Sequence, residues 1–188
     1  MNIEQFFEQF FKKDFISEYN HSNYINQING KQYFHMDCSG FVYWCLMQMG
    51  YTRALTELRI FLRQNSFIKI NRFYCKDFSF IYQHKQDFKY WNFLTSPLPN
   101  CILIVLFPDG NGHCMFVKEI INMDNNKMRL RVIDSTHYAH KNDTRIDNTG
   151  IGIGEIEISF KNGNYVYDSC NKSLPTRNAE IYFVSPIK

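Results

Sequence analysis

Two alternating segments in the second half of the chain constrain the fold most strongly. Within Gly112–Lys118, the odd positions are His, Met and Val, and the even positions end in a charged lysine. Within Lys127–Asp134, apolar residues at 128, 130 and 132 alternate with basic residues at 127, 129 and 131. Alternation of this kind is typical of half-buried strands. The segment Asn122–Asn126 between them is rich in turn-forming residues, so the two strands are predicted to form an antiparallel hairpin.

The predicted hairpin brings a histidine and an aspartate to its inner face. His113 has the phase of the apolar residues in the first strand, and Asp134 continues the apolar phase of the second. A carboxylate in that position is costly unless it has a partner. If Ile121 and Asn126 close the hairpin, His113 stands directly opposite Asp134, with the two Cβ atoms about 5 Å apart. The sequence therefore predicts a His–Asp couple on the core face of a sheet. The plainer alternative is a core histidine with satisfied hydrogen bonds beside a strand-end aspartate.

A cysteine with nucleophilic potential lies earlier in the chain, at the start of an apolar helix. Asp37 is a suitable N-cap for a helix that begins near Cys38, and Gly50 supplies a stop. A thiol in the first turn faces unpaired backbone amides and the positive end of the helix dipole, and both favour the thiolate. Because the thiolate is the form that attacks carbonyl carbons, Cys38 is a candidate nucleophile. The alternative is a buried structural cysteine behind a common capping turn.

The order of these features resembles the NlpC-type papain-like cysteine peptidases, a family of bacterial cell-wall endopeptidases. The resemblance rests on Asp37-Cys38-Ser39-Gly40 at a helix start, Gly112-His113 on a strand and a polar residue one strand later. It extends from Tyr24 to Asp134. Two further segments agree in order: Gly50–Leu58 is similar to the segment after the family's catalytic helix, and Pro99–Val105 is similar to its Pro-Gly-Asp strand before the histidine.

The resemblance implies a catalytic triad. Cys38 would be the nucleophile and His113 the general base. Asp134 would fill the position that orients the imidazole, where the family usually has His, Asn or Gln.

The resemblance also implies residues that bind the substrate. Asp37 and Ser39 match positions that help to hold a free substrate amine, and Tyr24 matches the family's upstream tyrosine. The Trp-Gly-Gly that normally follows that tyrosine is replaced by Ile25–Gln27. The substrate implied is a short peptide, most simply a peptidoglycan stem peptide with a free amino end.

The expected fold is α+β and papain-like, with N-terminal helices packed on an antiparallel β-sheet, and residues 1–188 are expected to form one domain. Helices are predicted at 52–63 and near 77–85, and later strands at 155–160 and 180–184. A stripe of phenylalanines at 6, 7, 10 and 11 has helical spacing; it is expected to pack on its own domain rather than on a membrane surface or a partner helix. The stretch 135–154 is predicted to be a polar loop that shapes a substrate cleft.

A metal site is the competing interpretation of this loop. Asp134, His137, His140 and Asp143 recur at intervals of three, which on a helical turn could gather ligands for zinc or another divalent ion. The segment has little helical character, however, so the prediction remains thiol chemistry that needs no metal and no cofactor.

Composition limits the other classes of function. A net charge of +3, without an arginine-rich run, gives no support for nucleic-acid binding. The 6 cysteines form no CxxC pair and are expected to be reduced. The N-terminus lacks the features of a signal peptide, and the longest apolar run is too short to span a bilayer. The expected location is therefore the cytoplasm, or secretion by a route independent of a signal peptide.

Taken together, the sequence predicts a cysteine peptidase or amidohydrolase that acts on a peptide substrate. Two alternatives stay open. One is a cysteine deamidase or acyltransferase that acts on a protein, and the other is a catalytically inactive binding module with the same cleft.

Overall fold

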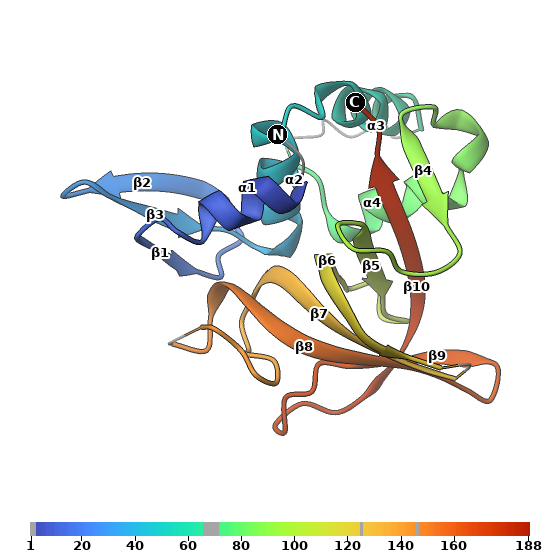
Figure 1. The fold of residues 1–188 in the computed structure, drawn as a ribbon. Helices are drawn as coiled ribbons and strands as arrows, with labels where there is room; N and C mark the ends of the chain where they lie inside the picture. The colour runs from blue at the N-terminus through green and yellow to red at the C-terminus, as the bar shows by residue number, and fades with distance from the viewer. Residues whose placement is uncertain (1–2, 66–71, 125, 146) are drawn as a thin grey trace.

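A computed structural model describes residues 3–65, 72–124, 126–145 and 147–188. Helices gather on one side of the molecule and a curved sheet forms the other side (Figure 1). The helices are α1 (Ile3–Phe10), α2 (Cys38–Gln48), α3 (Thr52–Asn65) and α4 (Cys75–Gln83), with a short 3-10 turn at Lys85–Asp87. The strands are β1 (Phe15–Glu18), β2 (Tyr24–Ile28), β3 (Lys31–His35), β4 (Trp91–Leu94), β5 (Ile102–Leu106), β6 (Gly112–Met123), β7 (Lys127–Thr136), β8 (Gly150–Lys161), β9 (Asn164–Asp168) and β10 (Arg177–Pro186).

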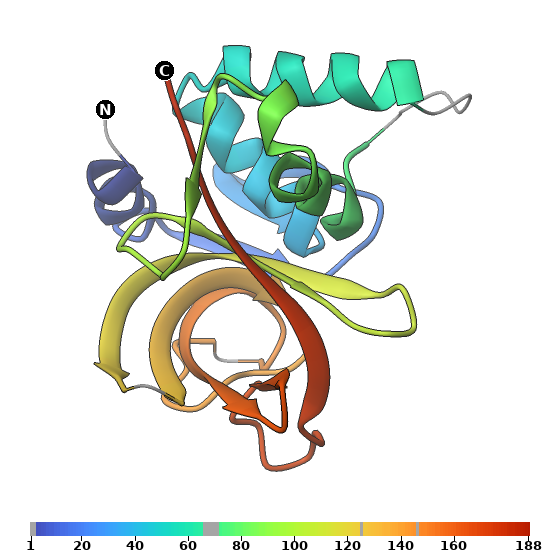
Figure 2. The same cartoon turned by 90° about the vertical axis from the view of Figure 1, so that its right-hand side faces the viewer.

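The main sheet closes into a barrel. Its strand order is β4-β10-β5-β6-β7-β8-β9, and β9 pairs in addition with β10, so that six antiparallel strands form a ring (Figure 2). The long strand β10 makes the closure possible because its successive segments have different neighbours. Residues 177–179 pair with β9, residues 180–184 pair with β5 on the opposite edge, and residues 183–186 pair with β4.

The expected papain-like layering of helices on an antiparallel sheet is therefore wrong. The strands are antiparallel and helices do cover one side, but the sheet is a closed six-stranded barrel. The hairpin patterns in the sequence could not show this, because closure requires β10 to pair both with its neighbour β9 and with β5, which lies far earlier in the chain. Closing the ring removes the edge strands that an open sheet would expose.

Two apolar cores lie on the two faces of the barrel wall. Along the strands β5 to β10, one set of side chains fills the barrel interior. The other set points outward and packs under the helices. In β5, Leu103 and Val105 belong to the interior core, whereas Ile102 and Ile104 belong to the core shared with the helices. All four are fully buried, which explains the unbroken apolar run in this strand.

The helical predictions are confirmed with small shifts in their ends. The helix expected at 52–63 is α3, and the one expected near 77–85 is α4. The phenylalanine stripe lies on α1, where Phe6, Phe7 and Phe10 are buried against the chain's own core. Among the described residues, no helix is both long and apolar enough to cross a lipid bilayer.

Two parts of the strand prediction needed correction. The small sheet β1-β3-β2, in which β1 runs parallel to β3, was not expected from the sequence. The predicted loop 135–154 is also too long, because β7 continues to Thr136 and β8 begins at Gly150. The strand expected at 180–184 lies within β10.

Candidate active site

Cys38 lies at the first residue of α2, as the capping pattern predicts. Asp37 is the N-cap, and its Oδ1 accepts a hydrogen bond of 2.8 Å from the backbone N–H of Gly40. The helix is apolar on all sides and packs against β6 and β7, so its first turn is held against the barrel wall. Cys38 itself is 5% exposed. The fold therefore fixes a thiol at a helix N-terminus, next to the strand that carries the histidine.

His113 and Asp134 are in direct contact at one end of the barrel interior. The His113 Nε2 and Asp134 Oδ2 atoms are 2.5 Å apart, and the Asp134 side chain is fully buried. The His113 imidazole also lies close enough to Cys38 for its charge and hydrogen-bonding capacity to lower the pKa of the thiol. Because Nε2 is used by Asp134, the nitrogen left for Cys38 is Nδ1. The structure thus brings Cys38, His113 and Asp134 together.

The register that brings His113 and Asp134 together differs from the predicted one. Phe116 pairs with Ile133 rather than with the residue expected from a hairpin closed at 121 and 126, and two bulges follow in β6 before the turn. Continuing the Phe116–Ile133 register places Asp134 opposite residue 115, two positions from His113. A shift of two residues is one full strand repeat, so both side chains stay on the same face. The predicted register is wrong by two residues. Because this number is even, His113 and Asp134 still lie on the same face and remain in contact.

The electrostatic environment favours an ion pair between Cys38 and His113. A hydrogen bond from the Cys114 thiol, together with the charge and hydrogen bond of His113, holds the pKa of Cys38 well below its usual value despite burial. Burial alone would lower the pKa of His113, but the neighbouring Cys38 and Asp134 raise it well above the usual value. Both shifts favour the thiolate–imidazolium form of this pair.

Four further cysteines have pKa values that are shifted in the opposite direction. Burial raises the pKa of Cys45 and Cys114 well above that of a free thiol, and raises that of Cys101 and Cys170 to about 11. Cys38 is thus set apart from these four as the thiol whose ionised form is stabilised.

Asp134 has partners that sequence reasoning missed. Its Oδ2 atom lies 3.0 Å from His140 Nε2, and the Arg145 guanidinium bonds both its Oδ1 atom and, at 2.8 Å, its backbone oxygen. Burial alone would raise the pKa of Asp134, but Arg145, His140 and His113 hold it well below its usual value. Nothing in the polar stretch 137–149 marked Arg145 in advance. His140 was noticed only as a metal candidate.

The four residues of the proposed metal motif do not gather around one point. His137 packs on the ring of Tyr19, with centroids 4.0 Å apart, while Asp143 pairs with Arg145. A different group, His113, Asp134 and His140, does place its ligand atoms within 4.8 Å of one another. These atoms already bond each other, and a cation there would lie beside the Arg145 guanidinium. The donor set therefore fits a hydrogen-bond network better than a metal site.

The residues expected to hold a substrate amine are placed differently from one another. Asp37 and Ser39 both line the pocket that contains Cys38, but the Asp37 carboxylate is already engaged. Its Oδ1 accepts from Ser39 Oγ at 3.0 Å, and its Oδ2 lies 2.6 Å from Arg72 and 3.1 Å from His21 Nδ1. Tyr24 lies on β2, stacks on the ring of His35 and lines a separate cavity.

The pocket at Cys38 has a volume of about 250 Å³ and a polar, partly basic lining. Tyr19 reaches it from the end of β1, and burial raises the pKa of its phenol, so the hydroxyl stays protonated. Arg72 and Lys76 contribute positive charge. The remaining lining includes the turn Gly110–Gly112 ahead of His113. Sequence analysis did not single out Tyr19, because its position depends on the unexpected β1–β3 pairing.

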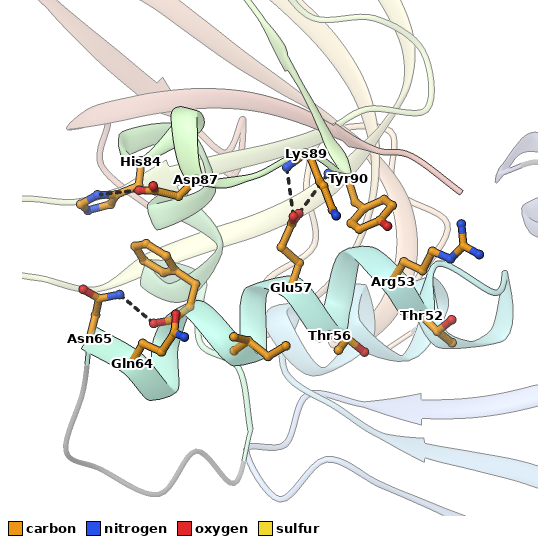
Figure 3. Close-up of a pocket in the computed structure, with 12 residues that line it drawn as sticks. Thr52, Arg53, Thr56, Glu57, Gln64, Asn65, His84, Asp87, Lys89 and Tyr90 are labelled. Atoms are coloured by element: carbon orange, nitrogen blue, oxygen red, sulfur yellow. Dashed lines mark hydrogen bonds and ion pairs between the residues drawn. The ribbon is translucent and has the colours of Figure 1, made fainter.

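A larger cavity, of about 740 Å³, lies elsewhere. It lies along α3 and the segment that precedes β4, and Glu57 closes one side by accepting the backbone N–H groups of Lys89 and Tyr90 (Figure 3). Its lining shares no residue with the pocket at Cys38. Size alone therefore does not locate the reactive groups.

Comparisons of the whole chain with protein-family models, with curated proteins and with solved structures find no match in any of the three.

Proposed function

We propose that the protein is a cysteine peptidase or amidohydrolase that cleaves an amide bond through Cys38, His113 and Asp134. The observation that carries the proposal is the placement of a helix-terminal thiol beside an imidazole that bonds a buried carboxylate. The separate shifts of the Cys38 and His113 pKa values support it, because they store the nucleophile as a thiolate and the proton on the imidazole. The resemblance to NlpC-type peptidases agrees with this assignment.

The chemistry follows from these positions. The Cys38 thiolate attacks the carbonyl carbon, and the oxygen of the resulting tetrahedral intermediate becomes negative. The intermediate collapses to a thioester as the C–N bond breaks, and the His113 imidazolium gives its proton to the leaving nitrogen. His113 then takes a proton from water, the water oxygen attacks the thioester, and the C–S bond breaks to return the thiolate. Throughout, Asp134 keeps the ring oriented and stabilises its positive charge.

Two donors are available for the negative oxygen. The backbone N–H of Cys38 belongs to the first turn of α2, where amides lack intrahelical acceptors. The Tyr19 hydroxyl lines the same pocket and stays protonated, so we assign it as the second donor.

Two classes of substrate are candidates. The resemblance implies a short peptide such as a peptidoglycan stem peptide, held by its free amine near Asp37. The engagement of Asp37 by Arg72 and His21 favours the second candidate, a deamidase or acyltransferase that acts on a protein side chain, because no free carboxylate remains for an amine. Both candidates use the same thiolate, and both differ from an inactive binding module in forming an acyl-enzyme.

Mass spectrometry of the folded protein after incubation with substrates tests the proposal. Wild type, Cys38→Ser and the matched control Cys170→Ser are each incubated with muropeptides and with glutamine-containing proteins. We expect peptide fragments, or products of deamidation or acyl transfer, from wild type and Cys170→Ser, and none from Cys38→Ser. Turnover by Cys38→Ser at the wild-type rate would refute the proposal. Addition of EDTA should leave turnover unchanged, whereas loss of turnover on chelation would instead support a metal at the His113, Asp134 and His140 group.

A further inference from the structure

The loop between β7 and β8 places two nitrogen-rich side chains against Asp134. His140 Nε2 lies 3.0 Å from Asp134 Oδ2, and Arg145 bonds the Oδ1 and backbone oxygen of the same residue. The side chains of His140 and Arg145 are 2% and 1% exposed. Burying these groups together is costly, and apolar residues of similar volume would serve the fold as well. Their presence therefore calls for a reason other than packing.

The loop residues are themselves held in place by a second set of contacts. Asp143 binds the Arg145 guanidinium and also accepts a 2.7 Å hydrogen bond from the backbone N–H of His140. The Nε atom of Arg145 donates to the Gly150 oxygen at 2.7 Å, and His140 Nδ1 lies 3.0 Å from the Ser169 oxygen. Both side chains are thus fixed from the side that faces away from Asp134.

The glycines of β8 leave the space that these side chains need. A Cβ atom at Gly152 would lie 2.5 Å from the Arg145 Cγ, and one at Gly154 would lie 2.6 Å from the His140 Cβ. Either contact is too close for a packed side chain, so the alternate glycines of this strand make room for the two side chains. This packing explains two of the three glycines in Gly150–Gly154, whereas Gly150 has a positive φ and lies against Ser17.

The arrangement determines both the charge and the direction of the Asp134 carboxylate. Arginine is protonated at all accessible pH values, so Arg145 favours the ionised carboxylate. The His140 ring lies between the Ser169 carbonyl and the Asp134 carboxylate, with one ring nitrogen near each. With Arg145 on Oδ1 and His140 on Oδ2, the carboxylate cannot turn away from His113.

We propose that His140 and Arg145 are positioning residues, which keep Asp134 ionised and directed at the His113 imidazole. The proposal rests on the proposed function and assigns the loop 137–149 to the catalytic machinery. Titratable groups face this carboxylate from each neighbouring element. They are His113 on β6, which connects it to Cys38 on α2, His140, Asp143 and Arg145 on the loop, and Tyr167 on β9.

The pH dependence of Cys38 alkylation by iodoacetamide tests this without a known substrate. The alkylation rate of Cys38 falls at acidic pH, and this fall is the acid limb of the rate profile. In wild type, Asp134 stays ionised throughout this limb, because its pKa is held well below the usual value. In Arg145→Met, Asp134 takes up a proton at higher pH, His113 loses its anionic partner, and the imidazolium that supports the thiolate is destabilised. We expect the acid limb to move up by about one pH unit, which is about a tenfold slower reaction at any pH on that limb.

Comparison variants separate positioning from structural support. Arg129→Met removes an arginine of β7 that pairs with Glu155, away from Asp134, and should leave the limb unchanged. Arg145→Lys retains the charge without the paired hydrogen bonds, so it should keep the wild-type midpoint but react several-fold more slowly. His140→Gln should shift the limb in the same direction as Arg145→Met, by a smaller amount.

The outcomes are distinguishable from those of the proposed function. If Cys38 of wild type fails to react preferentially, the proposed function is wrong. If Cys38 reacts but folded Arg145→Met, Arg145→Lys and His140→Gln all match wild type in rate and midpoint, only the positioning role is overturned. If Arg145→Met does not fold, the Arg145→Lys rate decides, and a rate equal to wild type refutes the role.

Discussion

Asp134 shows how one buried residue can connect the fold to the chemistry. The carboxylate is wholly inside the protein, where an unpaired charge is costly, yet three side chains bond it and its pKa is held well below the usual value. An aspartate among the inward-facing residues of a strand is therefore tolerated only if other elements of the fold supply hydrogen-bond partners for its carboxylate. His113 is the partner that the proposed catalysis uses.

The Asp134 series gives the first prediction. Asp134→Ala should lower turnover by up to about 10⁴-fold, because the His113 ring loses both its orientation and the charge that stabilises the imidazolium. Asp134→Asn and Asp134→His should fall between Ala and wild type, since both can still bond the ring. His137→Ala, whose ring packs on Tyr19, should affect mainly substrate binding. Steady-state kinetics, with thermal melts to confirm folding, would expose an error if Asp134→Ala retained near-wild-type turnover.

A tyrosine comparison gives the second prediction. Tyr19→Phe removes the assigned oxyanion donor and should lower kcat by about 10²-fold or more, with less change in KM. Tyr24→Phe, on the exposed strand β2 and in a different cavity, should change kcat by less than about twofold, in line with a surface substitution. Equal effects of the two substitutions on kcat would mean that the donor is assigned wrongly.

At the scale of elements, α1 and α2 explain how Cys38, the proposed nucleophile, is held. The aromatic rings of α1 pack against Phe41 and Trp44 of α2, and Phe7 also contacts Phe116 on β6. The helix that begins at Cys38 is thus fixed between the N-terminal helix and the barrel wall. Mutations in α1 should act through stability rather than through the chemical step.

Phe10 tests this element-level account. The residue is 4% exposed and its ring lies among those of Phe15, Phe34 and Trp44. Phe10→Ala should lower the free energy of unfolding by about 3–5 kcal/mol, the usual cost of a phenylalanine cavity. Phe160→Ala, at a site that is 44% exposed, should cost much less. Urea denaturation measures both, and similar losses for the two variants would contradict the packing described.

At the scale of the molecule, local features were predicted from the sequence and non-local ones were not. The N-cap at Asp37, the apolar helix after it, and the inward phases of His113 and Asp134 follow from side-chain type and period alone. The barrel closure requires β10 to pair with β5, which lies far earlier in the chain. The parallel β1–β3 pairing skips over β2, and the Arg145–Asp134 contact spans 11 residues, so neither follows from a local hydrophobic period. The register was wrong for the same reason, since two bulges in β6 leave no clear mark in the sequence.

The buried carboxylates predict how stability depends on pH. The pKa values of Asp37 and Asp134 are lower in the folded protein than in the unfolded chain. These two carboxylates therefore stabilise the fold fully at pH values above their pKa in the unfolded chain, near 4. The stabilisation is lost as the pH falls from there through their pKa values in the folded protein. Each unit by which folding lowers a pKa adds about 1.4 kcal/mol to the free energy of unfolding at neutral pH. Urea midpoints at pH 7, 5 and 3.5 should fall steeply only in the last interval, and Asp134→Asn should flatten that fall. A midpoint that rises between pH 5 and pH 3.5 would contradict the ionised state of these residues.

The most direct test of the central claim is the order in which the cysteines of the folded protein are alkylated. Iodoacetamide at mildly acidic pH, followed by peptide mass spectrometry, measures the rate at each thiol separately. The account predicts that Cys38 reacts first and alone, because a free thiol titrates near 8.5 whereas catalytic thiols at such sites titrate between about 3.5 and 7.5. The His113→Ala variant should lose this advantage. Equal labelling of several cysteines, or no labelling at Cys38 while the protein stays folded, would contradict the assignment of Cys38 as the nucleophile.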